Sequence, residues 1–581
     1  MVMQHYLVFA YSIRPIPDPL RPAIAERRTV PELSLKSKGV GEFPIVVSNA
    51  SANSQATSPG LAAVVFRNIG ANLARAAVVS AVAILLPSYL THHLAVKVYA
   101  AWVLIIQLGA YVSYFDLGIQ TGISKFVAER DAKGEHLEAG RYASAGLALM
   151  LLAGILGGVL TLGLAWQIPK LFSAMPASLF PEVRISLILV GFSLSFGLVC
   201  SVYSAVFLGL QRYWIPTVIT IFNRVLFAIA VIIAVHAGGN LAMVGLAVAL
   251  VNILAGVLQV LTLKKRAAHV WVSLGLVDFR VLKSVARYCS LQSISTIAMF
   301  CITGLDIVIV GHFDYVQTAY YSIATLPTSF LLLIISSLLS PLMPASSALS
   351  ARFSPSQMGT FLAKITRYNT IVLLLVGLPL VVFAFPILRL WVGSEYAFRT
   401  VAYLRILVFA NVVRNLCAPY ATMITATARQ KSVVAAAVSE ALVNLGSSLY
   451  LAWRFGAMGV AMGTVIGSLV SVLVHFAISM RLTRPVISMS RRRLFLRGIL
   501  GPCIICLPSA LLLPRWWSAT DLHLTSGMSM LWILCTVIPA YYCLNREERQ
   551  NFSRLILPFR RGYTRTVFSM LLSSETKRGR G

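Results

Sequence analysis

The sequence is poor in charged residues, and above all in acidic ones. Only 12% of its 581 residues are Asp, Glu, Lys or Arg, about half the share of a typical soluble domain, and 58% are hydrophobic. The 19 acids face 49 Lys and Arg, which gives a formal net charge of +30. So little charge excludes a water-soluble enzyme. The basic excess does not indicate nucleic acid binding, because no segment offers a basic soluble domain with its own core.

Cysteines and catalytic motifs are sparse as well. The eight cysteines lie in or beside apolar stretches, so we expect no disulfide framework. Cys503 and Cys506 form a C-x-x-C pair, but no second Cys or His pair completes a zinc set. The adjacent His92 and His93 face different ways on any regular element. The chain lacks the G-K-[ST] of a Walker motif, so we expect no ATPase. We also expect no metal and no cofactor.

Long apolar runs are what the chain does contain. Fourteen stretches reach about 20 residues, the length with which a helix crosses a bilayer core of about 30 Å. We therefore predict an all-α polytopic membrane protein with about 14 transmembrane helices. The predicted spans are 70–90, 98–118, 143–166, 185–208, 217–237, 241–263, 289–310, 319–345, 369–391, 401–426, 433–453, 456–478, 498–517 and 526–544.

The distribution of Lys and Arg predicts the orientation. If the N-terminus is cytoplasmic, the cytoplasmic segments hold 38 of the 49 bases, the opposite side holds seven, and four lie inside spans. This bias is the positive-inside signature, and an even number of spans places both termini in the cytoplasm. We expect a disordered cytoplasmic tail over 1–65, lobes of six helices over 66–265 and 266–485, two more helices over 486–545, and a basic cytoplasmic tail over 546–581.

The two sets of six spans are weakly similar to each other. Gly245 lies at the start of the sixth span and Gly459 at the start of the twelfth, 214 residues apart. The loop residues Arg212 and Arg429 are 217 residues apart, which is nearly the same offset. Two six-helix halves in the same orientation, facing each other, have the geometry of an alternating-access transporter.

Four arginines lie inside the predicted spans, where a charge is costly unless it faces protein or water. Arg75, Arg224 and Arg405 are near span ends and within reach of the headgroups. Arg414 is at mid-span, and Asn411 and Asn415 share its helix face. This polar stripe indicates either the lining of a cationic cavity or an arginine fixed by helix carbonyls or a carboxylate.

The membrane region contains few acids to balance these arginines. We place three carboxylates there, Asp116, Asp306 and Glu440, so that the interior is net cationic and suited to an anion. Asp116 and Asp306 lie near span ends, where a carboxylate caps a helix or pairs with a base. All three are candidates for ion coupling.

Several motifs occur in order along residues 62–485: Asn68-Ile-Gly70, Tyr99-Ala-Ala-Trp102, Phe115-Asp116-Leu117-Gly118, Gly209-Leu210-Gln211-Arg212, and Asp306-Ile307-Val308-Ile309-Val310-Gly311 followed by Tyr320-Tyr321. Together they resemble the polysaccharide transport proteins, the O-antigen and exopolysaccharide flippases of the multidrug/oligosaccharidyl-lipid/polysaccharide exporter superfamily. The resemblance implies a V-shaped exporter fold of two six-helix lobes plus two C-terminal helices.

The resemblance also implies a function. Such proteins move an undecaprenyl-pyrophosphate-linked oligosaccharide, an exopolysaccharide or O-antigen repeat unit, across the bacterial inner membrane by alternating access. The implied partners are this lipid-linked oligosaccharide, membrane lipids, and a polysaccharide polymerase with its export machinery. Residues then expected to bind the substrate are Arg414, Arg224, Arg75, Arg405, Asn411 and Asn415, and those expected to couple an ion gradient are Glu440, Asp306 and Asp116.

Three alternatives stay open. A peptidoglycan lipid-precursor flippase of the same superfamily also has a cationic cavity and fourteen spans. A cation-coupled multidrug antiporter would need carboxylates in the first lobe, whose spans hold only Asp116. A membrane polysaccharide polymerase or glycosyltransferase, the different-class alternative, needs catalytic groups on large outer loops. Because the longest outer loop, 167–184, has Glu182 as its only acid, we do not expect an enzyme.

Overall fold

The computed structural model describes residues 61–267, 269–427 and 431–504. Every regular element in these ranges is helical. Twelve helical segments there are long and apolar enough to cross a membrane, and each overlaps one of the first twelve predicted spans, although the ninth (Pro355–Val382) begins and ends earlier than the predicted 369–391. The prediction of an all-α polytopic membrane protein is therefore confirmed. Most of the thirteenth span, all of the fourteenth, residues 1–60 and the basic tail lie outside the described residues.

The N-terminal lobe consists of seven helices. They are α1 (Leu61–His93), α2 (Val96–Ala110), α3 (Ile119–Asp131), α4 (His136–Leu171), α5 (Phe180–Gly209), α6 (Trp214–His236) and α7 (Leu241–Arg266). The first of them begins at Leu61, inside the stretch that we predicted as a disordered tail.

The second predicted span is bent rather than continuous. A 3-10 turn (Tyr111–Asp116) separates α2 from α3, and Leu117 and Gly118 follow it with positive φ angles of 46° and 84°. A Cβ at Gly118 would lie 2.4 Å from Gln292 Cγ, so glycine serves both the backbone conformation and a close contact with the next lobe.

The C-terminal lobe is built from shorter pieces. Its elements are α8 (Phe279–Met299), α9 (Asp306–Phe313), α10 (Gln317–Leu339), α11 (Leu342–Ser350), α12 (Pro355–Val382), α13 (Ala384–Val392), α14 (Ser394–Asn415), α15 (Ala418–Ala426), α16 (Lys431–Phe455) and α17 (Ala457–Val474), followed by α18 (Met480–Leu482) and α19 (Arg491–Arg493). A π-helical segment, Phe300–Gly304, joins α8 to α9. Pro341 precedes α11 and Pro419 lies at the start of α15, as expected where proline interrupts a helix.

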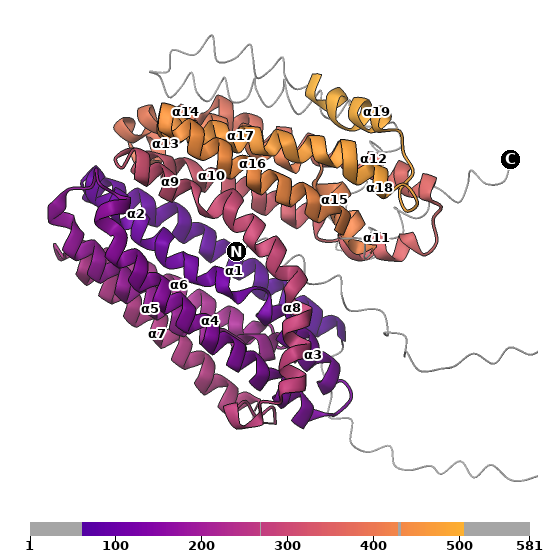
Figure 1. Cartoon of the computed structure of the whole chain (residues 1–581), viewed down its shortest axis with the longest axis horizontal. Helices are drawn as coiled ribbons and strands as arrows, with labels where there is room; N and C mark the ends of the chain where they lie inside the picture. Colours follow the sequence, from indigo (N-terminus) through magenta and orange to yellow (C-terminus); the bar gives the residue numbers. More distant parts are fainter. Residues whose placement is uncertain (1–60, 268, 428–430, 505–581) are drawn as a thin grey trace, which may run out of the picture.

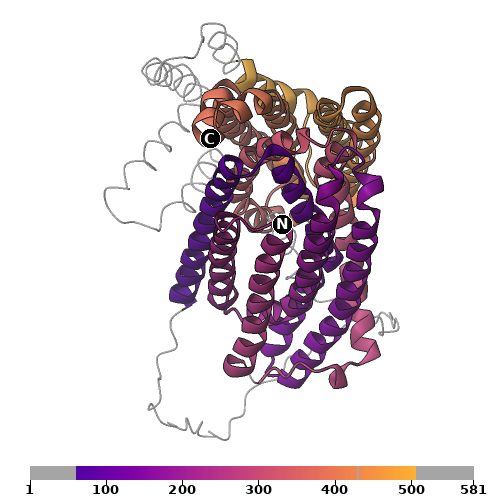
Figure 2. The ribbon, with the colours of Figure 1, turned by 90° about the vertical axis from the view of Figure 1, so that its left-hand side faces the viewer.

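The two bundles form a V (Figure 1). They meet at the end that carries the α1–α2, α4–α5 and α9–α10 turns, here called the joined end, and diverge toward α3 and α11. Figure 2 shows the helices of the first bundle side by side, with most of the second bundle above and behind them. Because the loops at the joined end are those we predict to be periplasmic, the diverging end is the predicted cytoplasmic end.

Direct hydrogen bonds close the joined end. Tyr315 Oη donates to the Lys97 carbonyl at 2.5 Å, and Trp391 Nε1 donates to the Ile84 carbonyl at 2.7 Å. His312 Nδ1 lies 2.6 Å from the Leu171 carbonyl oxygen. At the other end the link is α8, which packs against α3 and α4 of the first lobe before the chain continues into the second. The lobes are thus tied together at the joined end and by one crossing helix.

Glycines allow α16 and α17 to approach closely. Gly459, Gly463 and Gly467 recur every four residues on α17, and a Cβ at Gly463 would lie 2.6 Å from the Cα of Ser448 on α16. A Cβ at Gly467 would lie 2.7 Å from Asn444 Cβ. Such small-residue stripes let membrane helices pack backbone to backbone.

Substituting Gly463→Val should destabilise the C-terminal lobe, because the side chain has no space between α16 and α17. Overpacking of a filled interior costs about 1–3 kcal/mol. The measurement is the temperature at which the detergent-solubilised protein loses its monodisperse peak in size-exclusion chromatography. Gly446→Val on α16 is the matched control, because a Cβ at Gly446 meets nothing within 4 Å. Equal losses in both variants would contradict the packing argument.

Candidate functional site

Arg414 on α14 faces a carboxylate on α16. Its Nε forms a hydrogen-bonded ion pair with Glu440 Oε1, and the two side chains are only 12% and 5% exposed. Arg414 Nη1 also donates to Asn411 Oδ1 at 3.4 Å. Among the described residues, Nη2 is buried without a hydrogen-bond partner. Of the two arrangements expected for Arg414, the structure therefore has the carboxylate partner, with one donor left free.

Asp306 extends this polar group. It is the first residue of α9, directly after the π-helical segment, and it is 8% exposed. Its Oδ2 accepts a hydrogen bond from Thr464 Oγ1 of α17 at 3.4 Å, while Oδ1 is buried without a partner in the described part of the chain. The positive charge of Arg414 interacts electrostatically with this carboxylate. We call Asp306, Asn411, Arg414, Glu440 and Thr464 the C-lobe polar cluster.

Amide side chains hold the helices around the cluster. Asn444 Nδ2 donates to the Ile302 carbonyl in the π-helical segment at 3.4 Å, and Asn369 Nδ2 donates to the Asn415 carbonyl at 2.9 Å. Asn415, expected on the stripe with Arg414, uses its own Nδ2 on the Asn411 carbonyl at 2.8 Å. Sequence reasoning missed Thr464 and Asn369, because polar residues of these types recur along most spans and their spacing carries no signal.

The N-terminal lobe contains cations that no described carboxylate balances. Arg75 on α1 is half-buried, and its Nε has no hydrogen-bond partner among the described residues. Arg224 on α6 is exposed, with its guanidinium 5.6 Å from the Phe227 ring. In the C-terminal lobe, exposed Arg405 donates through Nε to the Val381 carbonyl at 3.1 Å. None of the three forms an ion pair within the described ranges.

Asp116 lies apart from the C-lobe polar cluster. It ends the 3-10 turn before α3 and is buried, and its Oδ1 accepts a hydrogen bond from the Gln120 backbone N–H at 3.1 Å. It therefore accepts from a backbone N–H in the first turn of α3, although Gly118 is the N-cap residue of that helix.

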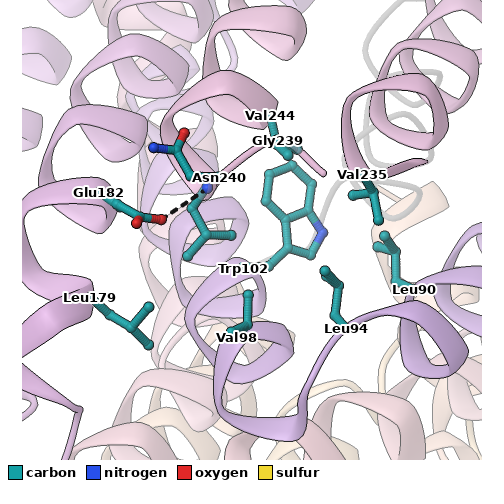
Figure 3. Close-up of a pocket in the computed structure, with 11 residues that line it drawn as sticks. Leu90, Leu94, Val98, Trp102, Leu179, Glu182, Val235, Gly239, Asn240 and Val244 are labelled. Carbon is teal, nitrogen blue, oxygen red and sulfur yellow. Dashed lines mark hydrogen bonds between the residues drawn. The ribbon is translucent and has the colours of Figure 1, made fainter. Parts of the chain in front are cut away.

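Two cavities lie away from the predicted arginines. One, of about 250 Å³, lies between α1, α2, α5, α6 and α7 at the joined end, with Trp102 inside it (Figure 3). Its carboxylate, Glu182, accepts a hydrogen bond from the Leu241 backbone N–H at 3.1 Å and so serves the start of α7. The other is an apolar groove of about 400 Å³ on α5 and α7 that exposes Phe192 and Leu250. Its composition is that of a lipid-facing surface.

Comparisons with known proteins identify the fold. No family model matches the chain, and no curated protein matches it. Among solved structures, the lipid II flippase MurJ in an inward closed conformation is similar with a TM-score of 0.64 and 13% identity, covering 85% of this chain and 100% of that one. An inward-facing multidrug resistance MATE family transporter of the MOP superfamily gives 0.57 and 18%, covering 70% of this chain and 94% of that one. An outward-facing structure of this kind gives 0.52 and 15%, covering 73% and 95%.

At these identities the similarity establishes the fold alone. The chain is a multi-pass membrane protein with the fold of MOP-superfamily transporters. This agrees with the V-shaped exporter fold implied by the sequence resemblance. The narrower resemblance to the polysaccharide and O-antigen flippases is neither supported nor opposed by these neighbours.

Proposed function

We propose that the protein is a flippase that moves an undecaprenyl-pyrophosphate-linked oligosaccharide, an exopolysaccharide or O-antigen repeat unit, across the bacterial inner membrane by alternating access. The observation that carries the proposal is the presence of Arg75 and Arg224 in membrane spans without a carboxylate partner in the described part of the chain. Cations without a carboxylate near the predicted cytoplasmic ends of spans are suited to an anionic ligand such as a pyrophosphate, which would lie at the level of the headgroups. The similarity to a lipid II flippase over that protein's whole length supports a lipid-linked substrate.

In this proposal the N-terminal lobe provides the main substrate-binding arginines and the C-terminal lobe provides the carboxylate for ion coupling. With both termini in the cytoplasm, the lobes diverge toward the cytoplasm, as expected of an inward-facing state in an alternating-access cycle. Arg75 and Arg224 attract the pyrophosphate, with Arg405 and the free Nη2 of Arg414 as further donors. The polyprenyl chain stays in lipid between the lobes. Asp306, with a buried oxygen that has no hydrogen-bond partner among the described residues, is the carboxylate best placed for ion coupling, ahead of Glu440, which forms an ion pair with Arg414.

A peptidoglycan lipid-precursor flippase is an equally supported alternative, because its substrate has the same lipid-pyrophosphate chemistry and a lipid II flippase shares the fold. A multidrug antiporter also shares the fold. It would need a carboxylate free to hold a cation in the first lobe, whereas Asp116 already accepts a hydrogen bond from the Gln120 backbone N–H.

Deletion of the gene in its host is the decisive experiment. We expect loss of one surface polysaccharide and accumulation of its lipid-linked repeat unit on the cytoplasmic side, both reversed by the wild-type gene. Accumulation of the lipid-linked peptidoglycan precursor with lysis would instead establish the peptidoglycan alternative. Normal polysaccharide with altered drug tolerance would contradict the flippase proposal altogether.

A further inference from the structure

Two histidines and an aspartate meet at the diverging end of the N-terminal lobe. Asp131 ends α3, His136 begins α4, and His269 lies in the segment after α7. One ligand atom from each residue lies within 4.8 Å of the other two. His136 Nδ1 is 3.2 Å, and His269 Nε2 is 3.9 Å, from Asp131 Oδ1. We propose that these three side chains form a binding site for a divalent transition-metal ion of the Zn²⁺ type, which ties the linker between the lobes to the first lobe.

The turn between α3 and α4 fixes two of the three ligands. The Glu135 N–H donates to the Arg130 carbonyl at 3.0 Å and the Gly134 N–H donates to the Asp131 carbonyl at 2.9 Å, which is the pattern of a Schellman C-cap. Gly134 has a φ of +73°, which a side chain would disfavour. Asp131 and His136 are therefore held close together by the backbone, before any ion binds.

The third ligand comes from a segment that is anchored beside α4. Val270 next to His269 is fully packed, with 1% of its surface exposed. Three residues later, the Ser273 N–H donates to Ser144 Oγ on α4 at 3.0 Å. Gly140 on α4 makes room for this segment, because a Cβ there would lie 2.6 Å from the Trp271 carbonyl oxygen. His269 thus approaches Asp131 through packing that does not depend on the histidine itself.

The bases next to Asp131 in the sequence are paired with other carboxylates, so the described ion-pair partners of Asp131 are the two histidines. Arg130 is paired with Glu135 at 2.7 Å, and Lys133 is paired with Glu129 at 3.3 Å. The side chains of Asp131, His136 and His269 are 32%, 49% and 38% exposed, so an ion can reach them and keep a water molecule.

The donor set selects the kind of ion. Two imidazoles and one carboxylate are a common Zn²⁺ set, with a fourth, tetrahedral position for water. Imidazole nitrogen favours Zn²⁺, Ni²⁺ and Cu²⁺ over Mg²⁺ and Ca²⁺. Metal–nitrogen bonds of about 2.0–2.1 Å require the three side chains to close in by small rotations only, since the ligand atoms are already neighbours.

A bound ion would act on the connection between the lobes. The segment that carries His269 leads into α8, whose Cys289 Sγ contacts the Gly118 carbonyl oxygen at 3.6 Å in the first lobe before the chain passes into the second. An ion at this site would fasten the start of that segment to the α3–α4 turn. We therefore expect metal binding to stabilise the predicted cytoplasmic base of the first lobe.

The test uses the full chain in detergent, without a polyhistidine tag and with Cys503→Ser and Cys506→Ser to remove thiol ligands. Titration with Co²⁺ should give one saturating set of visible d–d bands that Zn²⁺ abolishes. Because loss of an outer-shell partner alone costs about 10–100-fold in affinity, His269→Ala and His136→Ala should each weaken binding at least about tenfold. His236→Ala, an exposed histidine at the end of α6, is the matched control and should bind Co²⁺ as the parent does.

A second readout covers the case of a poorly folded variant. Zn²⁺ should raise the thermal midpoint of the parent and of His236→Ala but not that of His269→Gln, which retains the size of the side chain in the linker. Absence of saturable Co²⁺ binding to the parent would overturn the proposal. So would unchanged binding in both His136→Ala and His269→Ala, or an equal loss in His236→Ala.

Discussion

Replacing Glu440 by alanine is expected to destabilise the protein by about 3–5 kcal/mol, because it leaves the Arg414 charge buried without its partner. The hydrogen bond that the guanidinium keeps within the described ranges is the 3.4 Å one to Asn411, and Nη2 has no acceptor there. Little water is present to compensate, since the arginine side chain is 12% exposed. The thermal midpoint of the detergent-solubilised protein, followed by size-exclusion chromatography, measures the loss.

The double variant Arg414→Met/Glu440→Leu separates stability from transport. Removing both charges together should restore much of the midpoint, because no charge is then left unpaired. A double variant that is stable but inactive in the polysaccharide complementation assay would assign Arg414 or Glu440 to transport. A double variant that is stable and active would restrict the pair to a structural role. An unchanged midpoint in Glu440→Ala would show that the ion pair contributes nothing to stability.

Sequence patterns predicted the twelve described spans because hydropathy is a property of each segment alone. The breaks within spans were harder to anticipate. At the bend, Gly118 packs so closely against Gln292 of the other lobe that a Cβ would not fit, and the π-helical segment before Asp306 has no proline to mark it. Local composition does not contain these contacts.

In the candidate sites too, single residues could be predicted from the sequence, whereas their contacts with distant residues could not. Arg414 at mid-span was predicted to need a partner or a cavity, and Glu440 was recognised as a buried acid, but their pairing requires α14 and α16 to be adjacent. Asp131 and His136 are close in sequence, yet the cluster they form is completed by His269, which is distant in the chain. Functional groups assembled from several helices become visible only once the helices are packed.

Substituting Arg75→Ala together with Arg224→Ala is expected to reduce transport of the lipid-linked oligosaccharide by two orders of magnitude or more. A hydrogen bond to a charged group contributes about 1.5–3 kcal/mol, so each lost contact to the pyrophosphate corresponds to roughly 10–150-fold in binding. Neither side chain has a carboxylate partner in the described ranges, so their removal strands no acid there and should leave folding intact. The measurement is the rate at which substrate reaches the outer leaflet in reconstituted vesicles.

The matched control for this pair is Arg454→Ala, a base at the end of α16 whose guanidinium lies 5.3 Å from the Trp453 ring at the joined end. It removes positive charge without removing a cation from the interior of a span, so transport should stay near the parental rate. The charge-conserving pair Arg75→Lys and Arg224→Lys should keep more activity than the alanine pair, since an ammonium still attracts phosphate but without the bidentate geometry of a guanidinium. Parental transport by the alanine pair would show that the anion binds elsewhere, and would leave the free Nη2 of Arg414 as the next donor to remove.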